Sequence, residues 1–286
     1  MTVLNELLDL LRLEPIEQTV FRGQSQDLGW GQVFGGQVLG QALSAAEQTV
    51  PEDRPVHSLH AYFLRPGDVK RPIVYMVDPI RDGRSFTTRR VVALQNGKAI
   101  FNLAASFQQP EESFDHAAPM PTDIPGPEGL KNQEQLAEEW TKGLPERVQR
   151  RATSRRPIEI RPIGPDDPLR PHIEEPIRRA WFRASGDLPD DPRVHTYLLA
   201  YASDFHFLTT ALNPHGASWL TPGLKVASLD HAMWFHRPFR FDDWLLYSVE
   251  SPSAHASRGL VSGRFYDRSG RLVASVMQEG LLRDQR

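Results

Sequence analysis

Apolar residues recur at helical and at strand spacing along the chain, and these two periods predict its main elements. Between Met1 and Glu14, four leucines at helical spacing predict an amphipathic helix. A second helix is predicted from Phe34-Gly35-Gly36 to about Gln48, and its many small residues favour close contact with a sheet. A third, long helix is predicted from Arg193 to Leu212, because Pro189-Asp-Asp-Pro192 is a typical helix start and Asn213-Pro214 ends the pattern.

The strand-like segments form two similar series. The segment His60-Ala-Tyr-Phe-Leu-Arg-Pro66 resembles His231-Ala-Met-Trp-Phe-His-Arg-Pro238, and three apolar segments follow each copy. They are Ile73 to Val77, Ser85 to Leu94 and Ile100 to Phe107 in the first series, and Trp244 to Val249, Ser257 to Tyr266 and Leu272 to Met277 in the second. A repeat at about half the chain length predicts two copies of one small domain. Each copy combines a long helix with an antiparallel meander, which predicts an α+β fold.

The predicted boundaries of the two copies follow from the composition between them. Residues 1–108 form the N-terminal unit, which has a short first strand at Val20 to Gly23. Residues 109–156 form a linker, because its first part is rich in Pro, Glu, Ser and Asp and only one polar helix, Gln133 to Val148, is predicted in it. Residues 157–286 form the C-terminal unit, with strands at Ile158 to Ile163 and Arg179 to Ala184 before its helix and four strands from Lys225 to Leu282 after it.

Composition narrows the classes of protein to which the chain can belong. The formal net charge of −3 over 286 residues favours neither nucleic acid nor an anionic membrane as a partner. The absence of cysteine excludes a disulfide scaffold, a thiolate nucleophile and a metal bound by cysteine. No apolar run approaches the roughly 20 residues of a membrane helix, and the start does not have the pattern of a signal peptide. We therefore expect a cytoplasmic protein without a membrane span.

Three polar residues interrupt the apolar patterns of the C-terminal unit and are the candidates for chemistry. Asp204 lies beside the apolar stripe of the long helix, where it either reaches solvent at the edge or serves as an acid or base. Strand alternation puts Ser228 on one face with Val226 and Asp230, and puts Gln278 among core positions. Each of these polar groups alone can be a locally satisfied core residue. Together they have the donors and acceptors needed to hold and polarise one water molecule.

Other chemistries have weaker support in the sequence. The histidines are numerous, but no HExxH or similarly spaced cluster occurs, so no metal site is predicted. A serine hydrolase would have a G-x-S-x-G elbow, and a nucleotide-binding protein a Walker A or G-x-G-x-x-G motif; none of these occurs. No cofactor is expected.

Several long motifs, spread over essentially the whole chain, match one known family. They are Phe21-Arg-Gly-Gln-Ser25, Val33-Phe-Gly-Gly-Gln-Val38, His57-Ser-Leu-His-Ala-Tyr-Phe-Leu-Arg-Pro-Gly67, Asp204 in its helix, Leu229-Asp-His-Ala-Met-Trp-Phe-His-Arg-Pro238 and Ala274-Ser-Val-Met-Gln-Glu-Gly280. With these motifs the chain resembles the bacterial acyl-CoA thioesterase II family. The resemblance implies a double hot-dog fold, in which each of two units is a long helix wrapped by an antiparallel sheet. This agrees with the internal repeat.

The resemblance also implies a site and a reaction. The family's catalytic set of an Asp, a Thr or Ser hydroxyl and a Gln falls on Asp204, Ser228 and Gln278, with Ser228 at a position where many members have Thr. The implied reaction is hydrolysis of fatty acyl-CoA to free fatty acid and CoA. In it, Asp204 activates a water molecule as a general base and no acyl-enzyme forms.

Two further features are weaker candidates for a role toward the substrate. The backbone N–H groups of Gly35 and Gly36, at a helix start, are candidates to bind the developing oxyanion. His57 is a candidate for a role on the substrate side, and the alternative is a satisfied strand histidine. The predicted helix that follows Gly36 has no Asp matching Asp204, so one site per chain is expected.

Two alternative functions stay open at this point. Other hot-dog enzymes are hydratases that use a His with an acid, but Asp230 and His231 are adjacent in a strand and point to opposite faces. A non-catalytic acyl-CoA-binding protein would bind the same ligand without releasing CoA. A homo-oligomer is expected because exposed sheet edges are usually covered, and the family resemblance favours a homodimer of these double units or a homotetramer. Some peroxisomal relatives end in Ser-Lys-Leu, whereas this chain ends in Arg283-Asp-Gln-Arg286, so that signal is absent.

Overall fold

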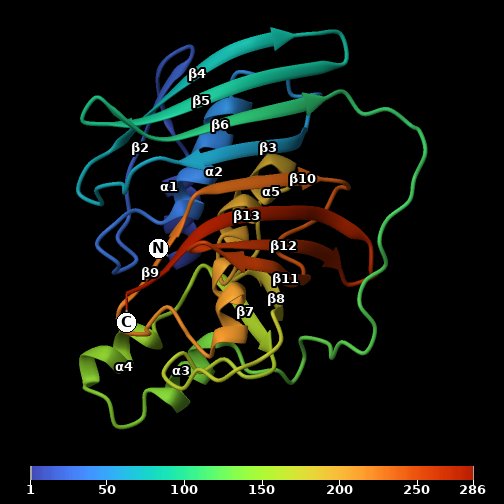
Figure 1. Ribbon diagram of the computed structural model, residues 1–286. Helices are drawn as coiled ribbons and strands as arrows, with labels where there is room; N and C mark the ends of the chain where they lie inside the picture. The colour runs from blue at the N-terminus through green and yellow to red at the C-terminus, as the bar shows by residue number, and fades with distance from the viewer. Residues whose placement is uncertain (1, 286) are drawn as a thin grey trace.

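The computed structural model describes residues 2–285 and consists of one long antiparallel sheet with two helices packed on its inner face (Figure 1). The helices are α1 (Val3–Leu11), α2 (Gly35–Glu47), α3 (Gln133–Trp140), α4 (Glu146–Ala152) and α5 (Pro192–Ser203), with a 3₁₀ helix, η1, at Leu208–His215. The strands are β1 (Glu14–Glu17), β2 (Val20–Gly23), β3 (Val56–Phe63), β4 (Ile73–Asp82), β5 (Phe86–Gln95), β6 (Lys98–Gln108), β7 (Ile158–Ile163), β8 (Ile177–Ala184), β9 (Leu224–Ser228), β10 (Asp230–Phe235), β11 (Leu245–His255), β12 (Arg258–Asp267) and β13 (Leu272–Asp284).

The strand order shows the internal repeat. From the centre outward, the first half of the sheet runs β3, β6, β5, β4, β2, β1, and the second half runs β10, β13, β12, β11, β8, β7. The two halves join where β3 pairs with β10, and Ala61 lies opposite His231. In Figure 1 the blue-to-teal half lies above the orange-to-red half, and the green linker crosses along one side. The predicted limits of the units and linker, 1–108, 109–156 and 157–286, stay predictions.

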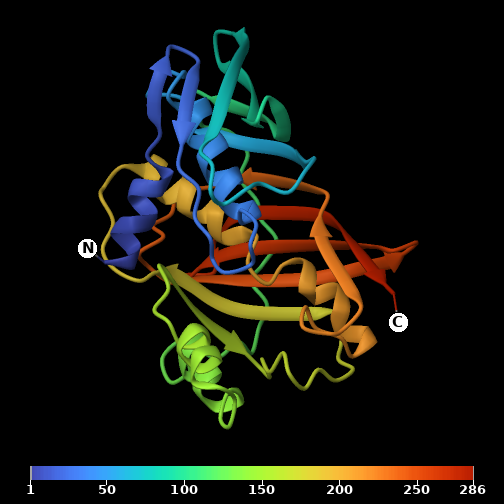
Figure 2. The same cartoon turned by 90° about the vertical axis from the view of Figure 1, so that its left-hand side faces the viewer.

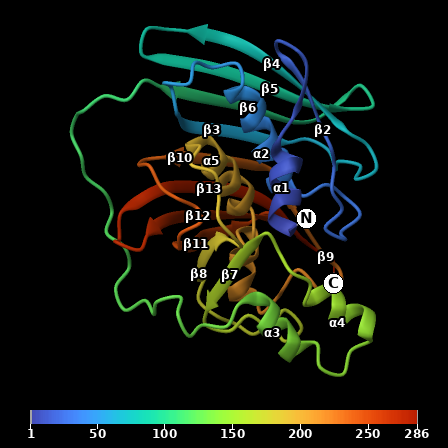
Figure 3. The same cartoon turned by 180° about the vertical axis from the view of Figure 1, so that it is seen from behind.

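Helices α2 and α5 lie side by side and run in opposite directions on the inner face of the sheet (Figure 3). An added Cβ at Gly36 would lie 2.2 Å from the carbonyl oxygen of Tyr201, and one at Gly40 would lie 3.1 Å from that of Tyr197. The two glycines therefore let the helix backbones approach closely. Because of this direction, the end of α5 lies against the start of α2.

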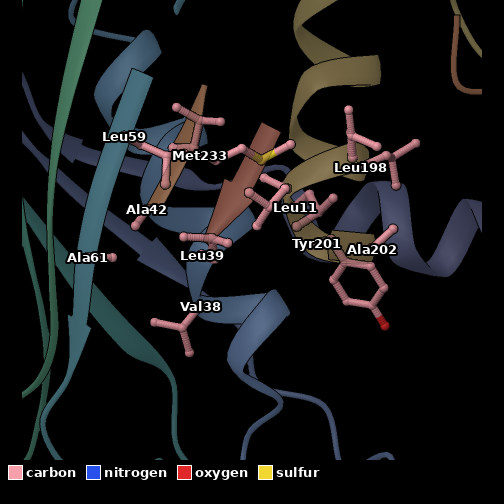
Figure 4. Packing of buried hydrophobic residues seen from close by; sticks show 14 of the residues in the cluster. Leu11, Val38, Leu39, Ala42, Leu59, Ala61, Leu198, Tyr201, Ala202 and Met233 are labelled. Atoms are coloured by element: carbon pink, nitrogen blue, oxygen red, sulfur yellow. The ribbon is translucent and has the colours of Figure 1, made fainter. Parts of the chain in front are cut away.

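The core fills the space between the two helices and the sheet. Its centre contains Leu39 and Ala42 from α2, Leu198 from α5, and Leu59 and Met233 from the two central strands, all of them fully buried (Figure 4). Leu11, from the amphipathic α1, packs against the same cluster. The side view in Figure 2 shows α2 and α5 on one side of the curved sheet. This packing fixes the helix ends relative to the central strands.

The structure corrects the alignment of the two repeated segments. The sequence comparison aligned His60 with His231, but His60 is exposed on the outer face of β3 and His231 is fully buried on the inner face of β10. Aligning the two Arg-Pro pairs that follow these strands instead places Leu59 at the position of His231, and both side chains point inward. The repeat is confirmed, and its correct register differs by one residue at the histidines.

Three predicted elements have different limits in the structure. The single linker helix is two helices, because Gly143 adopts φ +84° and Pro145 begins a new helix after it. The long helix of the C-terminal unit ends at Ser203, where His206 takes the left-handed conformation with φ +57°, and η1 follows. Five strands, not four, follow this helix, and β1 was not predicted.

Candidate active site

Asp204 lies at the junction of the two long helices. It is the C-cap of α5, not a mid-helix residue as predicted, and its carboxylate lies at the first turn of α2. An added Cβ at Gly35 would lie 2.6 Å from Oδ2 of Asp204, so only glycine leaves room for the carboxylate there. The Gly36 N–H donates a hydrogen bond to this carboxylate. The positive end of the α2 dipole therefore faces Asp204.

Ser228 reaches the same place because the strand is bulged. Ser228 pairs with Gly280 and Ala232 pairs with Met277, so the register against β13 slips by one residue around Leu229. The slip reverses the alternation of side chains. Ser228 faces inward, whereas Asp230 accepts a hydrogen bond of 2.7 Å from the Glu279 N–H. The prediction that Ser228 and Asp230 share a face is wrong for this reason.

Gln278 connects these groups from the neighbouring strand. It is fully buried on β13, and its Nε2 donates to the Ser228 hydroxyl oxygen at 2.8 Å. Hydrogen bonds from both Gln278 and Ser228 reach the Asp204 carboxylate. The structure thus brings together the three residues that the sequence singled out.

The surroundings of Asp204 make it a base that titrates near neutral pH. Burial raises the pKa of its carboxyl group to about 7, although the hydrogen bonds from Gln278, Gly36 and Ser228 oppose the rise. Part of the residue still reaches solvent, which leaves an approach for water and substrate. A carboxylate with such a pKa can take a proton from water more readily than an ordinary surface Asp.

Gly35 and Gly36, both predicted as candidates to bind the oxyanion, differ in what their N–H groups face. The Gly36 N–H is directed at Asp204 and stabilises its anion. Gly35 is the first residue of α2, and the N–H groups of a first helical turn have no partner within their helix. Gly35 therefore fits the predicted role of an oxyanion donor better than Gly36 does.

His57 is not brought to this cluster. It lies six residues before Phe63, the β3 residue that approaches Gly35, which is about 20 Å along an extended strand. Its Nε2 is 2.8 Å from the Ser106 hydroxyl, its ring meets Phe86 edge to face, and burial lowers its pKa. These contacts match the alternative of a satisfied strand histidine.

Sequence reasoning missed three residues around the cluster. His231 contacts Gln278, Ser203 contacts His231, and the Tyr247 hydroxyl donates to the Ser203 carbonyl oxygen at 2.9 Å. All three are buried. The two Arg-Pro pairs were the signal that could have placed His231 on the inner face, because they set the register of the repeat.

Two features of the described residues, 2–285, bear on other functions. They contain no group of three or more His, Cys, Asp or Glu side chains arranged to hold a metal ion. Within the same residues, no helix is long and apolar enough to cross a membrane.

Comparison with known proteins identifies the family of this chain. The family model described as "Acyl-CoA thioesterase" matches residues 150–281, and that of the "Acyl-CoA thioesterase N-terminal domain" matches residues 25–108. The chain is 44% identical to acyl-CoA thioesterase 2 of Haemophilus influenzae over 281 residues, 98% of each protein.

Solved structures extend the comparison to the fold. A crystal structure of an acyl-CoA thioesterase II from Mycobacterium marinum has a TM-score of 0.78 at 40% identity, covering 98% of this chain and 97% of that one. A protein of unknown function with a hot dog fold from Alicyclobacillus acidocaldarius has a TM-score of 0.78 at 18% identity, covering 98% and 99%. The predicted hot-dog architecture and the predicted enzyme class are confirmed. The chain therefore belongs to the acyl-CoA thioesterase family.

Proposed function

We propose that this acyl-CoA thioesterase hydrolyses fatty acyl-CoA with Asp204 as the general base. One observation carries the proposal: Asp204, Ser228 and Gln278 meet at the first turn of α2. In the reaction, the oxygen of a water molecule attacks the thioester carbon while the Asp204 carboxylate accepts its proton. The carbon–sulfur bond then breaks, and the proton passes to the CoA sulfur. The products are a free fatty acid and CoA.

The other two residues orient the base. Ser228 and Gln278 donate to Asp204, which holds its carboxylate in one position. We assign the Gly35 N–H to the oxyanion that forms on the thioester oxygen, because it lies at the positive end of the α2 dipole. The attack thus takes place between an oriented carboxylate and a fixed hydrogen-bond donor, and it needs no covalent acyl-enzyme.

Aromatic side chains beside Asp204 form a suitable wall for an acyl chain. The Phe34 ring stacks on Phe205 at 4.5 Å between centroids and meets Tyr201 edge to face at 5.2 Å. Trp30 extends this cluster to the surface. A narrow hollow, lined mainly by apolar side chains of β7, β8 and β11, also reaches Tyr247 near Asp204. This hollow has room for little more than one water molecule, so we propose that the acyl chain packs against the aromatic cluster of Phe34, Tyr201 and Phe205.

We also propose that copies of this chain associate. The outer face of the central strands exposes Tyr62 and Met277, which are 58% and 41% exposed, beside the partly buried Trp234. A second copy that covers this face would bury these side chains, which supports a homodimer or homotetramer. Light scattering after size exclusion tests this. Tyr62→Lys should weaken the assembly, and a monomeric wild type would contradict it.

The release of CoA from palmitoyl-CoA, followed with a thiol reagent, tests the catalytic proposal directly. The chain has no cysteine, so its own background is low. Asp204→Asn should lower the rate on the order of 10²-fold or more, because a neutral amide cannot accept the proton. Asp230→Asn is the matched control, because this carboxylate accepts from the Glu279 N–H on the other face of the strand and should be dispensable for the rate. An Asp204→Asn variant with wild-type turnover would contradict the assignment of the base.

A further inference from the structure

His231 is a polar residue in the core that the proposed reaction does not use. It lies on the inner face of β10, opposite Ala61 of β3, and has no exposed surface. The N-terminal unit has Leu59 at the equivalent position. The fold therefore tolerates an apolar side chain there, and the histidine requires another explanation.

Both ring nitrogens of His231 have partners in the candidate site. Nδ1 is 2.5 Å from Oε1 of Gln278, and Nε2 is 3.0 Å from the hydroxyl oxygen of Ser203. Ser203 immediately precedes Asp204, and its carbonyl oxygen accepts the hydrogen bond from Tyr247. The ring therefore joins the residue before the base to the amide that contacts the base.

The hydrogen-bond chemistry determines the direction of each contact. Nε2 of Gln278 donates to Ser228, so its Oε1 faces His231 and can only accept. Nδ1 of His231 must then carry a proton, and Nε2 is left as an acceptor. The single hydrogen of the Ser203 hydroxyl is therefore shared between Nε2, at 3.0 Å, and the Ala200 carbonyl oxygen, at 2.8 Å. Burial lowers the pKa of His231 to about 4, so the ring is neutral and has one N–H to donate.

We propose that His231 is a positioning residue that fixes the orientation of the Gln278 amide. By holding Oε1, it directs the Nε2 hydrogens toward Ser228 and Asp204. Without it, the amide can rotate by half a turn and present its oxygen to the carboxylate, which repels it. The inference rests on the proposed role of Asp204, Ser228 and Gln278.

Three variants at this position separate positioning from simple filling of the core. His231→Asn keeps a donor near the place of Nδ1 and should retain most of the turnover. His231→Gln, whose longer amide reaches the place of Nε2 near Ser203, and His231→Leu, which copies the N-terminal unit, both lose that donor. Each should lower kcat about 10–100-fold with KM changed less than about threefold, as for other residues that orient catalytic groups. His60→Asn, on the outer face of β3, is the control and should keep wild-type kinetics.

A double-mutant cycle with Gln278→Ala completes the test. If His231 acts through Gln278, adding His231→Leu to Gln278→Ala should lower kcat by less than about threefold further. The proposal would be overturned if the losses in kcat of the two single variants multiplied in the double variant. It would also be overturned if His231→Asn and His231→Gln lost equal fractions of kcat. Full activity of Gln278→Ala would instead contradict the proposed site. Loss in Gln278→Ala with none in His231→Gln would contradict only the positioning role.

Discussion

The two units of the chain have the same architecture, but only one has the polar cluster. In the N-terminal unit the register between β3 and β6 slips between Val56 and Ser58, as it does around Leu229 in the C-terminal unit. At the positions of Ser228, His231 and Gln278, the N-terminal unit has Val56, Leu59 and Ala105. The bulge is therefore a property of the fold, and the candidate site depends on the side chains placed around it.

The two ends of the helix pair formed by α2 and α5 also differ in the polar groups around their acidic residues. At one end, the C-cap of α5 is Asp204, which faces the glycines of α2. At the other end, the last residue of α2 is Glu47, which is buried beside Tyr197 of α5. Burial raises the pKa of Glu47 to about 8. Both ends thus contain an acid whose pKa is raised by burial. Glu47 has the Tyr197 hydroxyl as a partner, whereas Asp204 has a hydroxyl, a side-chain amide and a backbone N–H and is partly exposed.

The largest effect should come from giving the C-terminal unit the side chains of the N-terminal one. Gln278→Ala removes a donor to Asp204 and should lower kcat/KM for palmitoyl-CoA about 10²-fold. Ser228→Val should lower it about 10-fold or more, whereas Ser228→Thr, which keeps the hydroxyl, should stay within about threefold of wild type. Equal activity of the Val and Thr variants would show that the hydroxyl has no role.

The pH dependence of the rate should follow Asp204. With the pKa of its carboxyl group near 7, kcat/KM should fall on the order of tenfold per pH unit below that value and level off above it. Gln278→Ala removes a hydrogen bond that lowers this pKa, so the acid limb should move to higher pH. A profile that is flat from pH 5 to 8 would rule out Asp204 as the titrating base.

The two glycines at the start of α2 should respond differently to alanine. Gly35→Ala places a methyl group 2.6 Å from Oδ2 of Asp204 and should lower kcat/KM about tenfold with little change in Tm. Gly36→Ala meets the Tyr201 carbonyl oxygen at 2.2 Å, so the helices must separate, at a cost of about 1–3 kcal/mol in the free energy of unfolding. Rate assays and thermal melts of both variants check this. A Gly36→Ala variant with the wild-type Tm would contradict the close helix contact.

The smallest effect on activity is expected at Glu47. Because the pKa of Glu47 is raised, its contribution to the free energy of unfolding is largest below about pH 4.5 and is lost as the pH rises to about 8. Glu47→Gln stays neutral, so at pH 8 it should raise the free energy of unfolding on the order of 1–3 kcal/mol and increase Tm by several degrees. At pH 4.5 the two proteins should melt together. A lower Tm of the variant at pH 8 would contradict a buried, destabilised carboxylate.

Much of this fold could be predicted because local patterns agree with it. The small residues of α2, the Asp191 cap with Pro192 at the start of α5, and the alternation of the long strands all gave correct elements. The end of α5 could not be predicted, because the apolar stripe continues through Phe205 and Leu208 although the backbone turns at His206. The spacing of apolar residues gives no sign of a single residue in the left-handed conformation.

The candidate site was predicted residue by residue but not in its geometry. Strand alternation put Ser228 on the wrong face, because a one-residue bulge leaves no sign in the apolar pattern. It also left His231 unexplained, since its role depends on which neighbour lies across the strand pair. The contact of His231 with Gln278 comes from the sheet register, and that of Asp204 with Gln278 comes from the packing of α5 on the sheet.

The most direct measurement compares the two buried acids at opposite ends of the helix pair. It determines kcat/KM for palmitoyl-CoA in Asp204→Asn and in Glu47→Gln, at pH 8 and with thermal melts to verify folding. The account predicts a loss of about 10²-fold or more for the first variant and a change of less than about threefold for the second. Equal losses in both variants, or an active Asp204→Asn enzyme, would contradict the claim that Asp204, and not the acid at the other end of the helix pair, is the catalytic base.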